Sequence, residues 1–519
     1  MTTGETLAGV PVLSELAPSL AQTHLAGLDY DSRRVRQDYL FFAFPGARAD
    51  GHAFAEQAVS AGAVAVVSES PAPEGFAAPW IQVPHGRQAL ARAAKNFYGK
   101  LDEKIPLVGI TGTNGKTTTS YLVDSILRTA GMTTMLAGTI EYHLGSRILP
   151  APNTTPESLD LHRMLAELDS LGGLDSVIGL DSNHVKAAAM EVSSHALALG
   201  RVYGLHFHTA VFTNLTQDHL DFHHTMEDYF AAKQLLFTGS GSPPPRYSVI
   251  NRDDEWGRRL GALKPGKASD YSEILWYGLG GDGGTVARAR HINSTFNGLR
   301  FDVVYDKVRF EVRSQLIGKV NVYNILAACC VGMTFQLQPE IIARGIADCP
   351  GVPGRFERVD EGQPFAVVVD YSHTEDALRN AISVARSLNA KRIITLFGCG
   401  GDRDRTKRPL MGKAAGELSD LVILTSDNPR SEDPLQIMND ALVGLRRTDT
   451  RTIVEPDRAA AIRKAIEEAN AGDVVILAGK GHETYQIFRD RTIHFDDREI
   501  AREALRAFGF GRNAGGGAA

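Results

Sequence analysis

Short apolar runs alternate with longer amphipathic segments along most of this chain of 519 residues. The runs at 40–44, 107–111 and 393–397 are each followed by a polar turn and by a stretch with helical spacing of its apolar positions. This alternation is typical of parallel strands joined by helices and predicts the α/β class. The chain is too long for one ordinary core, and its length favours about three domains.

Breaks in this pattern divide the chain into expected domains. Residues 1–103 predict a small α/β domain, and the charged step at 101–104 is interpreted as a linker. A second α/β domain is expected over 104–347 and a third over 348–510. The terminal residues 511–519 are rich in glycine and alanine, cannot bury apolar surface, and are expected to be disordered.

Composition limits the kinds of molecule that this protein is expected to bind. The 55 basic and 61 acidic residues give a net charge of -6 and are spread along the chain, which leaves no basic footprint for nucleic acid. No apolar run approaches the length of a membrane span, so no membrane insertion is expected. Four cysteines without C-x-x-C spacing are too few for a disulfide framework. These features predict a cytoplasmic protein with small-molecule partners, and we expect a monomer.

One stretch carries a specific chemistry. Residues 107–120 read LVGITGTNGKTTTS: an apolar run, a glycine-bracketed turn, and a predicted helix that begins at Lys116. The N–H groups of such a turn and the positive end of the helix dipole form a cradle for phosphate, with Lys116 at the β- and γ-phosphates and the Thr117 hydroxyl at Mg²⁺. The generic pattern G-x-x-x-x-G-K-S/T requires glycine where this chain has Ile110, so an ordinary strand-turn-helix corner is the alternative. We predict ATP binding by Gly112, Thr113, Asn114, Gly115, Lys116, Thr117 and Thr118.

Acidic and histidine side chains follow the later strands of this segment. The apolar run at 187–191 ends at Glu191, and a buried carboxylate is costly unless it is paired or bound to metal. His219 and His223 are four residues apart, which leaves zinc as one alternative, although no cysteine or H-E-x-x-H motif supports it. A phosphate-bound Mg²⁺ assisted by Glu191 and His219 is more consistent with the nearby nucleotide loop. Lys233 on the next helix is, by its residue type alone, a solvated charge.

Helix boundaries are also predicted in this segment. Pro156 indicates the start of a helix capped by Thr155. Residues 318–330 predict a mostly apolar helix in which Asn324 either caps the helix or faces a ligand. Residues 172–186 predict a surface excursion without chemistry that the sequence identifies.

The last third of the chain repeats apolar runs that end in polar loops, as expected for parallel strands whose carboxyl-end loops line a cleft. The loop at 398–404, GCGGDRD, lacks the G-x-G-x-x-G spacing of a dinucleotide site, which is therefore rejected. The loop at 427–430, DNPR, is compatible with a simple turn that has proline at a favoured position. Against that interpretation, Arg430 offers a planar fork suited to bidentate binding of a carboxylate.

Ten segments, which occur in the same order over about residues 28 to 500, resemble the Mur ligases of peptidoglycan synthesis, specifically the members that add the third amino acid. The segments are TGTNGKTTT at 111–119, NTTP at 153–156, MEVSSHAL at 190–197, NLTQDHLDFH at 214–223, GKVNVYNILAA at 318–328, GVPGRFE at 351–357, DYSHTEDAL at 370–378, GCGGDRDRTKRP at 398–409, DNPRSEDP at 427–434 and GKGHE at 479–483. Ten matches in order are far more specific than any one of them.

The resemblance implies a small N-terminal uridine-binding domain, a central P-loop ATPase-type parallel sheet, and a C-terminal Rossmann-like domain that brings the amino acid. It implies that ATP phosphorylates the γ-carboxylate of D-glutamate in UDP-MurNAc-L-Ala-D-Glu, and that an amine attacks the resulting acyl phosphate. In the family, the lysine at the position of Lys233 is carbamylated by CO₂, and a carbamate supplies oxygens that Mg²⁺ accepts. The expected catalytic residues are Lys116, Lys233, His219 and Glu191, and the expected metal ligands are Thr117, Glu191, His219 and the carbamate of Lys233.

The resemblance also assigns binding residues. Asn324, Arg355, His373 and Asp376 are expected at the ATP site. The UDP-MurNAc-dipeptide is expected to contact Ser32, Asn153, Thr154, Thr155, Ser193 and Arg201. The diaminopimelate site is expected at Arg403, Asp427, Asn428, Pro429, Arg430, Gly479 and Glu483, with Glu483 pairing with the distal ammonium. Leu199 replaces a glutamine that is frequent in the family, which puts one substrate hydrogen bond in question, whereas Ser372 and Glu375 replace alanine and proline and are expected to be tolerated.

The choice of third amino acid depends on Arg430. The DNPR pattern is that of the family members that add diaminopimelate, and meso-diaminopimelate has a second carboxylate for Arg430 to pair with, whereas L-lysine has one carboxylate only. We therefore predict meso-diaminopimelate, with L-lysine as the alternative. Folylpolyglutamate synthetase, which shares the P-loop and the acyl phosphate, is disfavoured by the N-terminal domain and by DNPR. A regulatory nucleotide switch is a different class, and the N-K-x-D motif of a GTPase is absent from the sequence.

Overall fold

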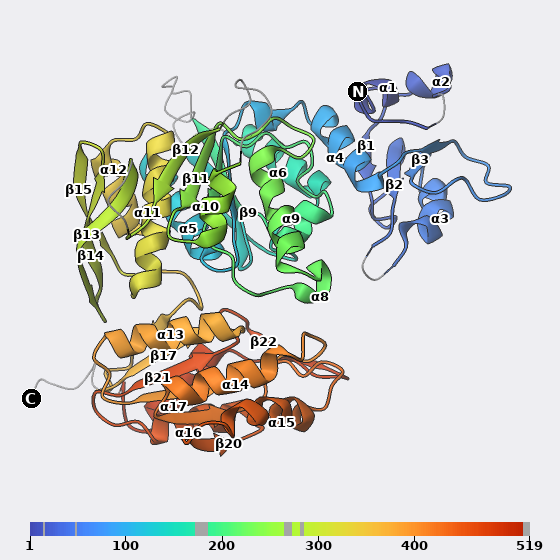
Figure 1. The fold of residues 1–519 in the computed structure, drawn as a ribbon. Helices are drawn as coiled ribbons and strands as arrows, with labels where there is room; N and C mark the ends of the chain where they lie inside the picture. Colours follow the sequence, from blue (N-terminus) through green and yellow to red (C-terminus); the bar gives the residue numbers. More distant parts are fainter. Residues whose placement is uncertain (14–15, 47–48, 172–184, 264–271, 281–284, 512–519) are drawn as a thin grey trace, which may run out of the picture.

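The structure is a computed structural model that describes residues 1–13, 16–46, 49–171, 185–263, 272–280 and 285–511. The predicted three-domain α/β class is confirmed: three separate sheets follow one another along the chain, each covered by helices (Figure 1). The expected tail falls outside these residues from 512 onward, as does the expected excursion over 172–184. No helix in the described ranges is both long enough and apolar enough to cross a bilayer.

The N-terminal body is a four-stranded parallel sheet in the order β1-β2-β3-β4. Side chains of β2 alternate between its faces: Leu40 and Phe42 pack toward α4, whereas Phe41 and Ala43 pack toward α3. The elements are α1 Thr3–Thr6, α2 Pro18–Ala21, β1 Gly27–Asp29, β2 Tyr39–Ala43, η1 Gly51–Phe54, α3 Ala55–Ser60, β3 Ala63–Ser68, β4 Trp80–Gln82 and α4 Gly86–Phe97.

The segment expected as a linker, 101–104, is folded and packed against its neighbours. Leu101–Glu103 form a short 3-10 helix, η2, and the Asp102 side chain is buried. Its carboxylate accepts hydrogen bonds from Lys95 Nζ at 2.8 Å and from the backbone N–H of His206 at 2.8 Å. A buried charge is tolerated when it is paired and hydrogen-bonded, so this charged step ties helix α4 to the central body.

The central body is an eleven-stranded sheet in the order β15-β14-β13-β12-β11-β10-β5-β9-β6-β7-β8. Its middle strands are parallel, and antiparallel hairpins extend both ends. Its strands are β5 Leu107–Thr111, β6 Thr133–Ala137, β7 Glu141–Leu144, β8 Arg147–Pro150, β9 Lys186–Glu191, β10 Thr209–Phe212, β11 Tyr247–Asn251, β12 Glu273–Tyr277, β13 Val286–Thr295, β14 Gly298–Tyr305 and β15 Val308–Ser314.

Helices cover both faces of the central sheet. One face packs against α5, α11 and α12, and the other against α6, α7, α9 and α10. The helices are α5 Lys116–Thr129, α6 Ser158–Ser170, α7 Ser194–Ala198, α8 Leu220–His223, α9 Met226–Thr238, α10 Glu255–Gly261, α11 Lys319–Thr334 and α12 Pro339–Asp348. The apolar helix expected at 318–330 is thus present as α11, which extends four residues further.

The predicted cap of α6 is wrong. The helix begins at Ser158, and its N-cap is Glu157. The Thr155 hydroxyl instead donates a hydrogen bond of 2.9 Å to the backbone carbonyl of Glu191, on the neighbouring strand β9. A buried hydroxyl takes whichever acceptor the fold brings to it, and here that acceptor is distant in the sequence.

The C-terminal body is a six-stranded sheet in the order β16-β17-β21-β18-β19-β20, with β16 antiparallel, and a hairpin β22-β23 beside it. Helices α13, α14 and α15 cover one face, and α16 and α17 the other. The elements are β16 Glu357–Val359, β17 Ala366–Asp370, α13 Glu375–Ser387, β18 Ile393–Phe397, α14 Lys407–Leu418, β19 Leu421–Leu424, α15 Pro434–Leu445, β20 Arg451–Val454, α16 Arg458–Glu467, β21 Val474–Ala478, β22 Tyr485–Ile487, β23 Thr492–His494 and α17 Asp497–Ala507.

Candidate active site

The glycine-bracketed loop connects β5, near the middle of the central sheet, to helix α5. Gly112 has φ 144° and Gly115 has φ 87°, both in the region that favours glycine. A Cβ at Gly112 would lie 1.9 Å from Thr213 Oγ1, and one at Gly115 would lie 2.4 Å from Asn324 Oδ1. Both positions therefore exclude side chains. The N–H groups of Thr113 and Asn114 already donate to the Asn214 carbonyl and to Asn214 Oδ1, both at 2.9 Å, so the N-terminus of α5 is the part of the loop that can receive an anion.

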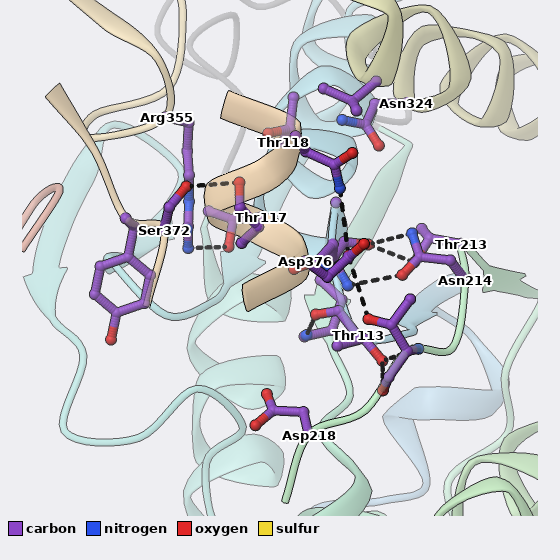
Figure 2. A pocket seen from close by; sticks show the side chains of 18 of the residues that line it. Thr113, Thr117, Thr118, Thr213, Asn214, Asp218, Asn324, Arg355, Ser372 and Asp376 are labelled. Carbon is purple, nitrogen blue, oxygen red and sulfur yellow. Dashed lines mark hydrogen bonds between the residues drawn. The ribbon is translucent and has the colours of Figure 1, made fainter. Parts of the chain in front are cut away.

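A cavity of about 470 Å³, which we name the phosphate-loop cavity, lies between the central and C-terminal bodies (Figure 2). Its wall from the central body includes Thr113, Asn114, Gly115, Lys116, Thr117, Thr118, Thr154, Glu191, Ser193, Asp218, His219, Lys233 and Asn324. Its wall from the C-terminal body includes Arg355, Tyr371, Ser372, His373 and Asp376. The structure thus brings the predicted nucleotide and metal residues together with two predicted residues of the dipeptide site.

Direct hydrogen bonds join the two bodies at this cavity. Asp376 Oδ2 accepts from Asn114 Nδ2 at 2.8 Å and from Thr216 Oγ1 at 3.3 Å. Arg355 Nη2 donates to the Thr117 hydroxyl at 3.2 Å, and its guanidinium lies 4.6 Å from the centre of the Tyr371 ring. Two side chains from the C-terminal body therefore contact the phosphate loop itself.

The other two predicted nucleotide residues lie further along the same walls. Asn324 is buried on α11 and donates from Nδ2 to Asn321 Oδ1 at 2.9 Å, so it belongs to a polar pair inside an otherwise apolar helix. The His373 ring is exposed, with Nδ1 2.9 Å from the Tyr371 carbonyl. Ser372, one of the two departures expected to be tolerated, is buried and hydrogen-bonds to the Asp370 carboxylate.

Two lysines converge on one carbonyl of the loop. Lys116 Nζ donates to the Gly112 carbonyl at 3.0 Å and to that of Thr113 at 2.8 Å. Lys233 Nζ, on α9, donates to the same Gly112 carbonyl at 2.8 Å and lies 4.6 Å from the centre of the Tyr229 ring. Burial lowers the pKa of both ammonium groups, and for Lys233 the charge of Lys116 adds to this lowering. Contrary to the solvated charge expected from its residue type, Lys233 is buried, and in the described part of the chain no carboxylate forms an ion pair with it.

Glu191 ends strand β9 as predicted and is fully buried at the cavity wall. Its carboxylate accepts from the Thr139 N–H at 2.8 Å and from the Thr139 hydroxyl at 3.0 Å. His219 has φ 53°, and burial lowers its pKa to about 3 although Asp218 opposes this shift. Its ring is therefore neutral at neutral pH, as a metal ligand must be.

Asp218 links the loop before α8 to the C-terminal body. Its carboxylate forms an ion pair with Lys407, the first residue of α14, and that charge together with His219 holds its pKa below its usual range against the effect of burial. The sequence reasoning missed this pair, because nothing local relates two residues so far apart. Among the described residues, no group of three or more His, Cys, Asp or Glu side chains is arranged to hold a metal ion.

The residues expected to bind the UDP-MurNAc-dipeptide lie in two places. Thr154 and Ser193 line the phosphate-loop cavity. Arg201 Nη1 donates to the carbonyl of Thr155, the residue after Thr154, at 3.1 Å. The Asn153 carbonyl accepts a hydrogen bond from the Tyr142 hydroxyl. Ser32 lies apart in the N-terminal body, where its hydroxyl donates to Gln57 Oε1 at 2.9 Å. Leu199 ends helix α7 as its C-cap and offers no hydrogen bond of its own side chain.

A second group of polar side chains lies at the carboxyl ends of β19 and β21, and we name it the amino-acid cluster: Asp427, Asn428, Arg430, Lys480 and Glu483. Asn428 Nδ2 donates to Glu483 Oε2 at 2.8 Å, and Arg430, at φ 53°, donates from Nη1 to the Gly401 carbonyl at 2.7 Å. Burial and the charge of Asp427 raise the pKa of Glu483, with Lys480 opposing. None of these residues is among those that line the phosphate-loop cavity.

The remaining residues predicted for this site lie around the cluster. Gly479 has φ 115°, and a Cβ there would lie 2.9 Å from Asp427 Oδ2. The Pro429 carbonyl lies so close to Gly401 that a Cβ on that glycine would be 1.9 Å away. The Arg403 side chain is exposed and donates to the carbonyl of its own neighbour, Asp402.

Three buried cations of the C-terminal body were missed by sequence reasoning: Arg408, Arg458 and Lys480. Arg408 forms ion pairs with Glu432 and Asp440. Lys480 lies inside the cluster, between residues that were predicted. Arg458 forms a bidentate ion pair with Asp497 at 2.8 and 2.6 Å and donates to the backbone carbonyls that precede Asp427 and Gly479. The GKGHE segment was a usable signal for Lys480, but an isolated lysine is by default an exposed residue.

Comparison with known proteins gives matches over nearly the whole chain. The family models described as Mur ligase family, catalytic domain, Mur ligase middle domain, and Mur ligase, glutamate ligase domain match residues 24–98, 110–332 and 354–481. A protein of Solibacter usitatus named UDP-N-acetylmuramoyl-L-alanyl-D-glutamate--2,6-diaminopimelate ligase is 63% identical over 98% of this chain and 99% of its own length. A protein of Geobacillus thermodenitrificans with the same name is 44% identical over 93% of this chain and 95% of its own length.

Solved structures agree with these matches. A structure titled UDP-N-acetylmuramoyl-L-alanyl-D-glutamate--2,6-diaminopimelate ligase aligns with a TM-score of 0.66 and 32% identity, over 95% of this chain and 97% of that chain. A Thermotoga maritima MurF ligase in complex with ADP aligns with a TM-score of 0.62 over 94% and 99% of the two chains, and at 19% identity it is similar in fold alone.

Proposed function

Since this chain belongs to the Mur ligase family, we propose that it is the ligase that joins meso-diaminopimelate to the D-glutamate γ-carboxylate of UDP-MurNAc-L-Ala-D-Glu at the expense of ATP. The observation that carries the proposal is the 63% identity, over 98% of the chain, to a protein that bears the name of that ligase. The reaction forms an acyl phosphate on the γ-carboxylate, and the amine of diaminopimelate then displaces the phosphate to give an amide.

Positive charge at the loop lowers the electrostatic barrier to the first step, the attack of the carboxylate on ATP. A carboxylate that attacks ATP is repelled by the phosphate oxygens, and a preorganised cation offsets that repulsion without reorganising. Lys116 is already held at the loop by two backbone carbonyls, and Arg355 reaches the Thr117 hydroxyl from the C-terminal body. We assign Lys116 to the β- and γ-phosphates, and Arg355, Asn324, His373 and Asp376 to the nucleotide.

Magnesium fits the donors at this wall. Glu191 presents a carboxylate that is hydrogen-bonded to Thr139 alone in the described residues, and His219 is neutral at neutral pH. When bound, the ion would neutralise phosphate charge, as Mg²⁺ does with few protein ligands and several phosphate or water oxygens. Thr117, Glu191, His219 and a carbamate on Lys233 are the residues we assign to hold it.

Carbamylation of Lys233 is consistent with its surroundings. Burial favours the neutral amine, whose nitrogen lone pair can attack the carbon of CO₂. The new N–C bond forms as one C–O π bond opens, and the amine proton passes to water, which leaves an anionic carbamate. That group places two oxygens beside Lys116, whose charge then favours the modified form.

The second half of the reaction requires the amino-acid cluster. We assign Arg430 to the distal carboxylate of diaminopimelate and Glu483 to its distal ammonium, with Arg403, Asp427, Asn428, Pro429 and Gly479 around them. Ser32, Asn153, Thr154, Thr155, Ser193 and Arg201 are assigned to the UDP-MurNAc-dipeptide. We also propose that the chain acts as a monomer in the cytoplasm, which size-exclusion chromatography with light scattering and fractionation of cells would test.

Phosphate release measured with each substrate omitted in turn tests the proposal. We expect release to require ATP, UDP-MurNAc-L-Ala-D-Glu and meso-diaminopimelate together, with one amide formed per phosphate. L-Lysine in place of diaminopimelate should support far less turnover. Release that continues without UDP-MurNAc-L-Ala-D-Glu would instead favour a nucleotide switch, and glutamate addition to folate would favour a folylpolyglutamate synthetase.

A further inference from the structure

Lys480 is the second residue after strand β21, and its side chain is fully buried. Its Nζ atom lies 3.2 Å from Asn428 Oδ1, 3.2 Å from Glu483 Oε2 and 3.6 Å from Asp427 Oδ1. All three partners are residues that we assign to the incoming amino acid. The ammonium therefore lies inside the site that is expected to receive a substrate ammonium.

The contact with Lys480 fixes the orientation of the Asn428 amide. Asn428 Oδ1 accepts from Lys480 Nζ and, at 3.0 Å, from the backbone N–H of Ile487. With its oxygen held by these two donors, the amide nitrogen points the other way and donates to Glu483 Oε2 at 2.8 Å. A neutral side chain at position 480 would leave this oxygen with one donor and Glu483 with one fewer partner.

Lys480 also sets the charge of the cluster. Asp427 and Glu483 contribute two carboxylates, and Lys480 neutralises one of them, so one negative charge is left for a substrate. The distal end of meso-diaminopimelate carries one ammonium and one carboxylate, and Arg430 supplies the positive charge for the carboxylate. Without Lys480, the two buried acids would repel each other, and one of them would take up a proton instead of accepting an ammonium.

Arg458, another buried cation of this body, has contacts typical of a purely structural role. Arg458 is equally buried, but its donors go to the Asp497 carboxylate and to backbone carbonyls. Its charge is compensated by a carboxylate outside the amino-acid cluster. The charge of Lys480 has no such external partner among the described residues, because every polar partner of its Nζ belongs to the cluster.

We propose that Lys480 determines amino-acid specificity as a positioning residue: it orients Asn428 and Glu483 and leaves one uncompensated negative charge for the distal ammonium of the diamino substrate. The inference rests on the proposed function, since it concerns the same amino-acid site. If the wild-type chain does not use meso-diaminopimelate at all, the proposed function fails. If the wild type uses it and the variants below behave like the wild type, only the inference about Lys480 fails.

The test compares Lys480→Met and Lys480→Gln with the wild type in the complete ligase assay. We expect the KM for meso-diaminopimelate to rise about tenfold or more, as when one partner of a buried pair is removed, with the KM values for ATP and UDP-MurNAc-L-Ala-D-Glu within about twofold of wild type. Lys464→Met, on α16 in the same body, is the matched control, because its side chain is 43% exposed, and it should leave all three constants unchanged.

The pH profile separates a charge role from a packing role. In Lys480→Met, the acid limb of kcat/KM for diaminopimelate should lie at higher pH than in the wild type, since Glu483 loses its neutralising partner. The charged and titratable groups that face Glu483 in the wild type are Asp427, Lys480, Tyr371, Tyr485 and Arg458. The second change Glu483→Gln should abolish this limb, and Lys480→Met should cost less in that background than alone.

Three outcomes would overturn the inference. The first is an unchanged KM for diaminopimelate in both variants, and the second is a parallel rise of all three KM values. The third is failure of both variants to fold, judged by the thermal midpoint, which would assign Lys480 to the core of the C-terminal body.

Discussion

The phosphate-loop cavity and the amino-acid cluster both contain acidic and basic side chains, but the two sets of side chains are held in place differently. In the cavity, the contacts of Asp376 with Asn114 and of Arg355 with Thr117 join two bodies. In the cluster, Asn428, Lys480 and Glu483 bond to one another within a single body. The geometry of the cavity therefore depends on how the C-terminal body is placed, whereas the cluster keeps its geometry when that body moves.

This difference assigns separate roles to the two regions. The phosphate loop is built from glycines and backbone groups of the central body, and Arg355 and Asp376 of the C-terminal body contribute to the lining of its cavity. The cluster is built from side chains that orient one another, and we propose that it selects the amino acid. Changes at the loop should therefore affect turnover, and changes in the cluster should affect the KM for one substrate.

The largest effect is expected for Lys116→Ala. This variant removes a cation that acts on charge developing in the transition state, so kcat should fall about 1,000-fold while the thermal midpoint stays close to that of the wild type. Phosphate release with all three substrates measures this. Lys413→Ala, on an exposed face of α14, is the control. Turnover above about one tenth of wild type, which corresponds to about 1.4 kcal/mol, would refute the role of Lys116 at the phosphates.

A somewhat smaller effect is expected for Lys233→Ala. If the carbamate supplies oxygens to Mg²⁺, its loss should lower kcat about 100-fold, and acetate should restore part of the activity by supplying a carboxylate in the vacated space. Acetate should not stimulate the wild type, which serves as the control. A fully active alanine variant, or a wild-type protein that shows no added mass at Lys233 in high bicarbonate, would contradict the carbamate.

In the cluster, Arg430→Ala should change the KM for meso-diaminopimelate only. Loss of a bidentate contact with a carboxylate should raise the KM for meso-diaminopimelate about 100-fold and leave that for ATP unchanged. Arg430→Lys should restore little, because an ammonium lacks the fork, and Arg446→Ala on the exposed end of α15 is the control. Equal kcat/KM of the wild type for L-lysine and meso-diaminopimelate would show that Arg430 does not select the second carboxylate.

The contrast between the phosphate loop, which is continuous in the chain, and the contacts between bodies explains what could be predicted from the sequence. The phosphate loop is local: a strand, a turn and a helix are continuous in the chain, and Gly112 and Lys116 follow from their spacing. The paired contacts across the bodies are not local, so the partnership of Asp218 with Lys407 has no signal in the sequence. The roles assigned to individual residues stay predictions, because the fold brings residues together without identifying what they bind.

Errors arose where a polar residue found a partner far away in the sequence. Thr155 was expected to cap α6, but its hydroxyl bonds to the carbonyl of Glu191. Lys233 was expected, by residue type, to be solvated, and only the family resemblance indicated otherwise. The residue type predicts the usual surroundings of each of these side chains, but tertiary contacts determine the surroundings that the structure shows.

The smallest expected effect is a difference in pH dependence between the two regions. The pKa of Glu483 is raised by burial and by Asp427, so when the pH is lowered from about 8 to about 5 Glu483 takes up a proton before an ordinary glutamate would, which removes an acceptor for the substrate ammonium. The pKa of His219 is lowered to about 3, so this ring stays neutral over the same interval and contributes no titration. The KM for meso-diaminopimelate should therefore rise about threefold on acidification while the KM for ATP stays constant.

Initial rates at saturating bicarbonate, which keeps the state of Lys233 constant, measure both KM values across this interval. Glu483→Gln is the informative variant: it should have a high KM for diaminopimelate that no longer changes with pH. If both KM values moved together with pH, the titrating group would lie in the phosphate-loop cavity rather than in the amino-acid cluster. A change confined to diaminopimelate would instead show that the charge of a single buried carboxylate controls this substrate, separately from the chemistry at the phosphate loop.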